Sequence, residues 1–200
     1  MDDKVKQAMA DAIWVGKAIF DLGKTAGSTG NISFRVDDKI YVTKSGSCFG
    51  RLTEDSWAIL DLEGNNLNGK KASKEYPMHM AFYKQYPEMQ GVIHTHGPYA
   101  TLLSCLQGST EEFLPKYTPY LEMKLGKIGW IPYAAPGSKE LFDAVAARVG
   151  EAKGFLMANH GAVVGGKSIM DAFYNIEELE ESAKIAWLLR NEKNAVLIKD

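Results

Sequence analysis

Histidine is the residue type in this sequence best placed to do chemistry, because only four are present and three of them follow apolar runs. His94 and His96 flank one threonine, and side chains at positions i and i+2 of a strand point to the same face. His160 follows the mainly apolar run 155–159 and precedes a glycine. Three neutral imidazoles that leave one coordination position open are typical of a catalytic zinc site. Imidazole also suits copper, iron or nickel, so ligand type alone leaves the metal open.

The fourth histidine, His79, lies four residues after Glu75, a spacing that places both side chains on one face of a helix. The pair could be a second metal motif. We favour the simpler interpretation that it is a pair on a helix surface.

Residues 161–168 match the phosphate-binding pattern GxxxxGK[ST] of nucleoside triphosphatases, between a predicted strand and a predicted helix. Such a loop surrounds phosphate with successive backbone N–H groups. The run 162–164 is instead apolar and β-branched, which favours an extended strand. No later strand ends in an aspartate suited to holding magnesium. We therefore predict a strand that turns at Gly165 and Gly166 into the last helix, without a nucleotide.

The elements that must position these residues follow from hydrophobic periodicity. It predicts helices over residues 5–22, 73–83, 100–106, 139–149 and 168–190, the second of them with Ser73 as its N-cap. It predicts strands over residues 32–36, 40–43, 58–62, 91–96 and 154–158. Repeats and linker-like stretches are absent from the sequence, so one α/β domain spanning residues 1–200 is expected.

Composition narrows the class of protein. The chain has 200 residues, 46% of them apolar, and a net charge of -2, which gives no reason to expect nucleic acid or an anionic membrane as a partner. Apolar stretches end well short of the ~20 residues that span a bilayer, and the acidic start has no signal-peptide core behind it. Cys48 and Cys105 fit no CxxC spacing. We expect a reduced, cytoplasmic setting.

Four motifs occur in an order and at separations that resemble one family. They are Gly-Ser-Thr-Gly-Asn-Ile-Ser at 27–33, Ser-Lys-Glu at 73–75 with His79, His-Thr-His at 94–96 and Asn-His-Gly at 159–161. Together they resemble the class II aldolase family, which includes L-fuculose-1-phosphate aldolase and L-ribulose-5-phosphate 4-epimerase. The resemblance covers nearly the whole chain, from the first helix to the last.

The resemblance implies a zinc-dependent enzyme. His94, His96 and His160 match the family's zinc ligands, and Glu75 matches the glutamate that coordinates the ion at rest and then acts as acid or base. Manganese or cobalt could replace zinc. The resemblance also implies a single three-layer α/β domain with a mainly antiparallel central sheet flanked by helices. It further implies a homotetramer whose active sites lie near subunit boundaries.

The positions that match the family's phosphate-binding residues are Ser28, Gly30, Asn31, Ser45, Gly46 and Ser73. The chemistry of the residues agrees, because small residues let backbone N–H groups approach a phosphate closely. A serine at a helix start adds N–H donors and the positive end of the helix dipole. Glycine-rich loops and N-cap serines are also common for purely structural reasons.

Other segments resemble one subgroup, the decarboxylases of 3-oxo-tetronate 4-phosphate. They are residues 103–106, 117–120, 131–133 with 136–137, and 174–181, together with Lys74 where sugar-phosphate aldolases usually have serine. One departure is Ala135, because the subgroup often has arginine before the Pro-Gly turn. The implied reaction converts a phosphorylated sugar acid into dihydroxyacetone phosphate and CO2 through an enediolate. The alternatives are a class II sugar-phosphate aldolase or an epimerase.

The resemblance and the chemistry of the side chains also suggest roles for individual residues. Glu75 is the expected proton donor, and Lys74 would contact the phosphate or the substrate carboxylate, unless it is only a solvated lysine at a helix start. Tyr120 would close the site or handle a proton, although buried aromatic packing would equally explain it. A non-catalytic relative of the same fold is disfavoured, because such a scaffold has no need of the three histidines and Glu75.

Overall fold

A single sheet organises the protein, which we describe from a computed structural model that covers residues 2–106 and 114–199. Within these residues seven strands lie in the order β3-β2-β1-β4-β7-β6-β5. All neighbouring strands are antiparallel except the parallel pair β5 and β6. The strands are β1 (Asn31–Val36), β2 (Lys39–Thr43), β3 (Trp57–Leu60), β4 (Gly91–Thr95), β5 (Ile128–Ile131), β6 (Gly154–Met157) and β7 (Gly161–Gly166).

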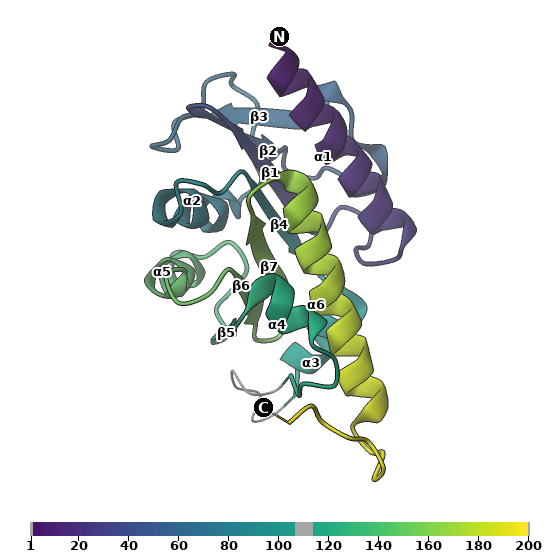
Figure 1. Ribbon diagram of the computed structural model, residues 1–200. Coiled ribbons are helices and arrows are strands. Elements are labelled where there is room, and N and C mark those ends of the chain that lie inside the picture. Colours follow the sequence, from purple (N-terminus) through teal and green to yellow (C-terminus); the bar gives the residue numbers. More distant parts are fainter. Residues whose placement is uncertain (1, 107–113, 200) are drawn as a thin grey trace.

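Helices cover both faces of this sheet. They are α1 (Asp3–Asp21), α2 (Tyr76–Gln85), α3 (Pro98–Ser104), α4 (Tyr120–Leu125), α5 (Lys139–Arg148) and α6 (Ile169–Leu189), with short 3-10 turns η1 (Phe49–Arg51) and η2 (Glu54–Ser56). Figure 1 shows α2 and α5 on one face and α1, α3, α4 and α6 on the other. This arrangement confirms the expected three-layer α/β fold with a mainly antiparallel sheet.

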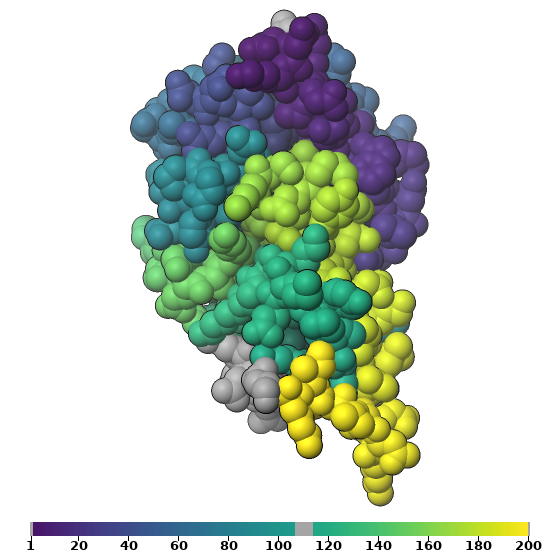
Figure 2. All heavy atoms as spheres, in the orientation of Figure 1, coloured from purple at the N-terminus to yellow at the C-terminus, as the bar shows by residue number. Residues whose placement is uncertain are grey.

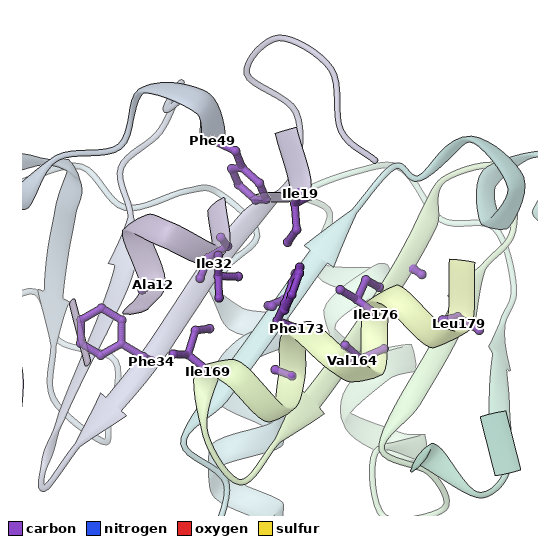
Figure 3. Packing of buried hydrophobic residues seen from close by; sticks show 14 of the residues in the cluster. Ala12, Ile19, Ile32, Phe34, Phe49, Val164, Ile169, Phe173, Ile176 and Leu179 are labelled. Atoms are coloured by element: carbon purple, nitrogen blue, oxygen red, sulfur yellow. The ribbon is translucent and has the colours of Figure 1, made fainter. Parts of the chain in front are cut away.

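Side chains along β1 point alternately to the two faces of the sheet, so β1 contributes both to an apolar core and to a polar site. Ile32 and Phe34 point toward α1 and α6, where they join a buried cluster with Phe173 (Figure 3). Asn31 and Ser33, one residue out of phase, point to the opposite face, where Ser33 contacts α2. A second apolar cluster packs α2 and α5 on that face. Polar side chains of β1 therefore face α2 beside an apolar cluster.

The second predicted helix begins later than expected. Helix α2 starts at Tyr76 with Glu75 in the N-cap position, so the prediction of Ser73 as N-cap is wrong. The Ser73 N–H donates to the carbonyl of Thr43 (2.9 Å), which keeps Ser73 in extended pairing with the end of β2. Pro77 lies in the first turn of α2, where its missing N–H has no cost.

One strand and one α-helix were not predicted. Strand β5 has four residues and helix α4 has six, both too short to show a clear period. Figure 2 shows the C-terminal residues lying against the segment that leads into α4, where the Ile198 N–H donates to the carbonyl of Lys116 (2.8 Å). In the described part of the chain, helices long and apolar enough to cross a membrane are not found.

The phosphate-loop look-alike is a strand. Residues 161–166 form a strand, as the apolar run predicted, and this strand β7 pairs with both β4 and β6. At the start of α6, Ser168 Oγ accepts from the Asp171 N–H (3.0 Å) and the Asp171 carboxylate accepts from the Lys167 N–H (2.9 Å). These N–H groups are thus already bound within the protein and are not presented to a phosphate.

Candidate metal centre and active site

The ends of three neighbouring strands bring the three histidines together. His94 lies on β4, and His96 follows the end of that strand. His160 lies in the tight turn from β6 to β7, where its N–H donates to the carbonyl of Met157 (3.1 Å) and Asn159 takes a φ of 54°. Because β4 pairs with β7, with His94 opposite Val163, this turn lies beside His94 and His96.

The three rings are spaced for one ion. Their centroids are 4.9–5.0 Å apart, and one nitrogen from each lies within 4.8 Å of the others. The Nε2 atoms of His94 and His96 are 3.1 Å apart. Zinc–nitrogen bonds of about 2.0–2.1 Å in a tetrahedron separate ligand atoms by about 3.4 Å. The imidazoles of His94, His96 and His160 therefore have the spacing of a tri-histidine metal site.

The protonation states also suit a cation. His94 Nδ1 donates to the carbonyl of Ala162 (2.9 Å), which leaves the lone pair on Nε2 facing the other rings. Burial lowers the pKa of His94 well below its usual value and also lowers the pKa of His96 and of His160. All three are thus neutral near pH 7, the form that binds metals.

His160 gives the most direct indication that these side chains bind an ion. Both of its ring nitrogens are buried without a hydrogen-bond partner among the described residues. An unpaired buried polar group costs about 1–3 kcal/mol, so such groups normally have a partner. A metal ion between His94, His96 and His160 would provide one.

The carboxylate of Glu75 faces this cluster. Its Oε2 lies 3.4 Å from His94 Nε2, and its Oε1 lies 3.4 Å from His160 Nε2. Asn31 Nδ2 donates to Oε2 (3.1 Å). Glu75 is only 5% exposed and is held at the start of α2. The carboxylate can thus reach the same ion as the histidines or a group bound to that ion.

His79 is not on a helix surface, and that prediction is wrong. It is 1% exposed, because this face of α2 packs onto β1. Its ring nitrogens bond to Ser33 Oγ (2.7 Å) and to the Asn31 side-chain oxygen. The i, i+4 spacing of Glu75 and His79 was the signal in the sequence, but it indicates an inward-facing pair here.

Two of the predicted phosphate-binding residues lie beside the histidines. Gly30 has a φ of 79°, and a Cβ atom there would lie 2.7 Å from the carbonyl oxygen of His94. Asn31 pairs with His94 across the sheet. Its side chain bonds to Glu75 and to His79. Ser28 is exposed on the turn that precedes these residues.

A second loop carries the remaining predicted phosphate-binding residues. The Ser45 N–H donates to the carbonyl of Lys71 (3.0 Å), and Lys44 forms an isolated bridge with Ala72. Ser45 and Gly46 are exposed, whereas Ser73 is buried next to Glu75. The loop with Ser45 and Gly46 therefore lies beside residues 71–73, which lead to Glu75 at the metal centre.

Lys74 and Tyr120 differ in how closely they approach the site. Lys74 Nζ donates to the carbonyl of Pro136 (3.0 Å), and its positive charge contributes to the lowered pKa of His160. Lys74 thus lies on the His160 side of the centre. Tyr120 begins α4 and is 58% exposed, so it is not a buried packing residue. The contacts between described residues do not connect Tyr120 to the histidines.

Sequence reasoning also missed Glu180. This residue of α6 is 4% exposed, and its carboxylate accepts from the N–H groups of Tyr99 (2.7 Å) and Ala100 (2.9 Å). It caps α3 directly after His96 and Gly97. Burial raises the pKa of Glu180. A run of several glutamates in α6 gave no signal that one of them faces inward.

The fold and the histidine centre define a class of protein, and comparison with known proteins identifies it. Residues 10–187 match the family described as "Class II Aldolase and Adducin N-terminal domain". The chain belongs to this family.

Two relatives and one solved structure illustrate the similarity. The chain is 42% identical to the 3-oxo-tetronate 4-phosphate decarboxylase of Haemophilus influenzae, over 90% of this chain and 87% of that protein. It is 36% identical to the L-fuculose phosphate aldolase of Methanocaldococcus jannaschii, over 88% and 93%. The crystal structure of YgbL from Klebsiella pneumoniae superimposes with a TM-score of 0.92 at 34% identity, over 97% of this chain and 94% of that one.

Proposed function

We propose that this protein is a zinc-dependent lyase that decarboxylates a phosphorylated 3-oxo sugar acid of the 3-oxo-tetronate 4-phosphate type to dihydroxyacetone phosphate and CO2. The observation that carries the proposal is the Glu75 carboxylate, 3.4 Å from nitrogens of both His94 and His160. The relative at 42% identity is named for this decarboxylation. The names of both relatives denote enzymes that break a carbon–carbon bond.

His94, His96 and His160 would hold the zinc ion, with Glu75 as a further ligand in the absence of substrate. Manganese or cobalt could replace zinc, because imidazole and carboxylate ligands suit all three ions. When bound, the ion supplies positive charge that polarises a ketone oxygen and stabilises the negative charge which that oxygen gains as the neighbouring bond breaks.

Glu75 would move the proton. Loss of CO2 leaves an enediolate, and the carbon that carried the carboxylate must then gain one proton to give the hydroxymethyl ketone. Glu75 is buried and faces the centre, and Asn31 holds its carboxylate in place, which suits a positioned acid or base.

The loops around the centre would bind the substrate's charged ends. Ser28, Gly30 and Asn31, together with the loop of Ser45 and Gly46 and the hydroxyl of Ser73, would surround the phosphate. Lys74 uses one of its N–H donors on Pro136 and has others for the substrate carboxylate or phosphate. Tyr120 would join a site only in the assembled oligomer, since it is exposed in the single chain.

The test combines metal analysis with measurement of CO2 release from a panel of 3-oxo acid phosphates. We expect about one zinc per chain and CO2 release from at least one substrate. Lys74→Ser should raise KM for the acid about 10-fold or more, since a charge-assisted contact is worth about 1.5–3 kcal/mol. Exposed Lys71→Ser is the matched control. Full activity in a metal-free sample would contradict the proposal.

The second candidate is a sugar-phosphate aldolase, because the relative at 36% identity is named as one. A 4-epimerase is the third, from the family resemblance. The same panel should therefore include L-fuculose 1-phosphate and L-ribulose 5-phosphate. Aldehyde formation without CO2 release from any acid, unaffected by Lys74→Ser, would replace the decarboxylase assignment by the aldolase.

We also propose that the protein is a cytoplasmic homotetramer. Cys48 and Cys105 are free thiols, which suits a reducing compartment. Large apolar side chains are exposed on the single chain, among them Trp14 at 55% and Tyr174 at 48%. Sedimentation equilibrium should give about four times the 22.1 kDa of one chain, and a monomer at micromolar concentration would contradict the assembly.

A further inference from the structure

A buried chain of hydrogen bonds ends on the Glu75 carboxylate. Tyr83 OH lies 2.8 Å from Ser33 Oγ, which lies 2.7 Å from His79 Nδ1. His79 Nε2 bonds to the side-chain oxygen of Asn31, and Asn31 Nδ2 donates to Glu75 Oε2 (3.1 Å). All five side chains belong to residues that are at most 5% exposed. The proposed chemistry uses Glu75 but does not account for His79, Ser33 or Tyr83.

The hydrogens of this chain can be ordered in one direction. The Asn31 amide nitrogen donates to the Glu75 carboxylate, so the amide oxygen faces His79. That oxygen needs a donor, which must be the Nε2–H of His79. Burial lowers the pKa of His79 to about 3, so the ring is neutral and carries one hydrogen. Its Nδ1 then accepts from Ser33 O–H, and Ser33 accepts from Tyr83.

We propose that His79 is a positioning residue for the reaction: its Nε2–H fixes the orientation of the Asn31 amide, and the amide in turn holds the Glu75 carboxylate between His94 and His160. This inference rests on the proposed acid–base role of Glu75. Without the bond from His79, the Asn31 amide could rotate and place its oxygen against the carboxylate. The two groups would then repel, and Glu75 would leave its position.

Two substitutions of His79 separate positioning from packing. In His79→Gln the side-chain amide reaches the place of Nε2 and can still donate to Asn31. In His79→Asn the shorter amide reaches only the place of Nδ1, keeps a partner for Ser33 and loses Asn31. Because a misplaced catalytic group costs up to about 100-fold, kcat should fall about 10- to 100-fold in His79→Asn with KM within about twofold. In His79→Gln, kcat should stay within about threefold of the wild type.

The control is Phe82→Leu, a buried change on the same helix in the apolar cluster that faces α5. It should lower the melting temperature and leave kcat unchanged. If His79→Asn and His79→Gln lose kcat equally, or if His79→Asn retains the wild-type kcat, the positioning role is wrong.

A spectroscopic measurement tests the same inference without turnover. Nitrogen-15 NMR of uniformly labelled wild-type protein should find His79 neutral with its hydrogen on Nε2. The Asn31 side-chain amide resonance should shift more in His79→Asn than in His79→Gln. A hydrogen on Nδ1 would overturn the inference even if His79→Asn failed to fold. If the wild type shows no lyase activity at all, the proposed function fails, while this measurement still decides the role of His79.

Discussion

At the scale of single residues, the position of Glu75 decides what the centre can do. Its two oxygens face different histidines, and Asn31 Nδ2 donates to one of them. Glu75→Gln keeps the shape of the side chain and removes its ability to transfer a proton. We expect kcat to fall about 10²- to 10⁴-fold, the usual contribution of an acid–base group.

The Glu75→Gln assay needs a check on folding and a matched control. The melting temperature should change by only a few degrees, and Glu178→Gln on α6 should retain the wild-type kcat. Unchanged turnover in Glu75→Gln would mean that another group transfers the proton.

The neutral state of His79 has a consequence for stability. Its pKa is about 3 in the folded protein and about 6.5 in the unfolded chain. The unfolded chain therefore binds a proton first as the pH falls. The stability is full above pH 6.5 and decreases below it, by about 1.4 kcal/mol per pH unit for this one group until pH 3.

Urea unfolding of the metal-free protein at pH 7, 6 and 5 measures this slope. The lowered pKa values of His94, His96 and His160 add to it in the same direction. His79→Gln cannot titrate, so its unfolding free energy should fall less steeply than that of the wild type. Equal slopes in the two proteins would show that His79 does not titrate as assigned.

At the scale of elements, the loop that leads into β1 is fixed by Gly30. Its φ is 79°, and an added Cβ would lie 2.7 Å from the backbone oxygen of His94. Gly27 also has a positive φ, 57°, but an added Cβ there would have no atom within 4 Å. A side chain at Gly27 would therefore meet only backbone strain. A side chain at Gly30 would meet backbone strain and also a steric clash with the backbone of His94.

Alanine substitutions at these glycines test how the loop is held. Gly27→Ala should cost only about 1 kcal/mol of unfolding free energy, from the left-handed conformation. Gly30→Ala should cost about 2–4 kcal/mol, because β1 must also move away from β4, and it should weaken substrate binding. Similar losses in both variants, measured by urea unfolding, would mean that the contact with His94 is unimportant.

The elements that periodicity predicted correctly are those long enough to show it. The stripe of α6 and the apolar run of β7 both identified their elements, and the same run correctly excluded a phosphate loop at 161–168. Strand β5 was missed because its position depends on pairing with β6, which is a contact between distant residues. The start of α2 was misplaced for the same kind of reason, since Ser73 pairs with Thr43.

At the scale of the whole molecule, the site depends on contacts that no local pattern contains. The spacing of His94 and His96 predicts a shared face, but their meeting with His160 follows from the pairing of β4 with β7. From the residues alone the three histidines were only a candidate set, and the order of four motifs along the chain made the set specific. The inward direction of His79 and Glu180 depends on how α2 and α6 pack on the sheet, which explains why both were missed.

Metal binding should therefore stabilise the whole fold, because the ligands come together only in the folded chain. At a metal concentration 1,000 times Kd the gain is about 4 kcal/mol, which corresponds to about 10 °C in melting temperature for a domain of this size. A chelator should lower the melting temperature by this amount, and added zinc should restore it.

His160→Ala is the informative variant for this metal effect, since it removes ring nitrogens that lack a partner among the described residues. It should change the metal-free melting temperature little and abolish most of the chelator's effect, whereas a full effect in His160→Ala would place the metal at other residues.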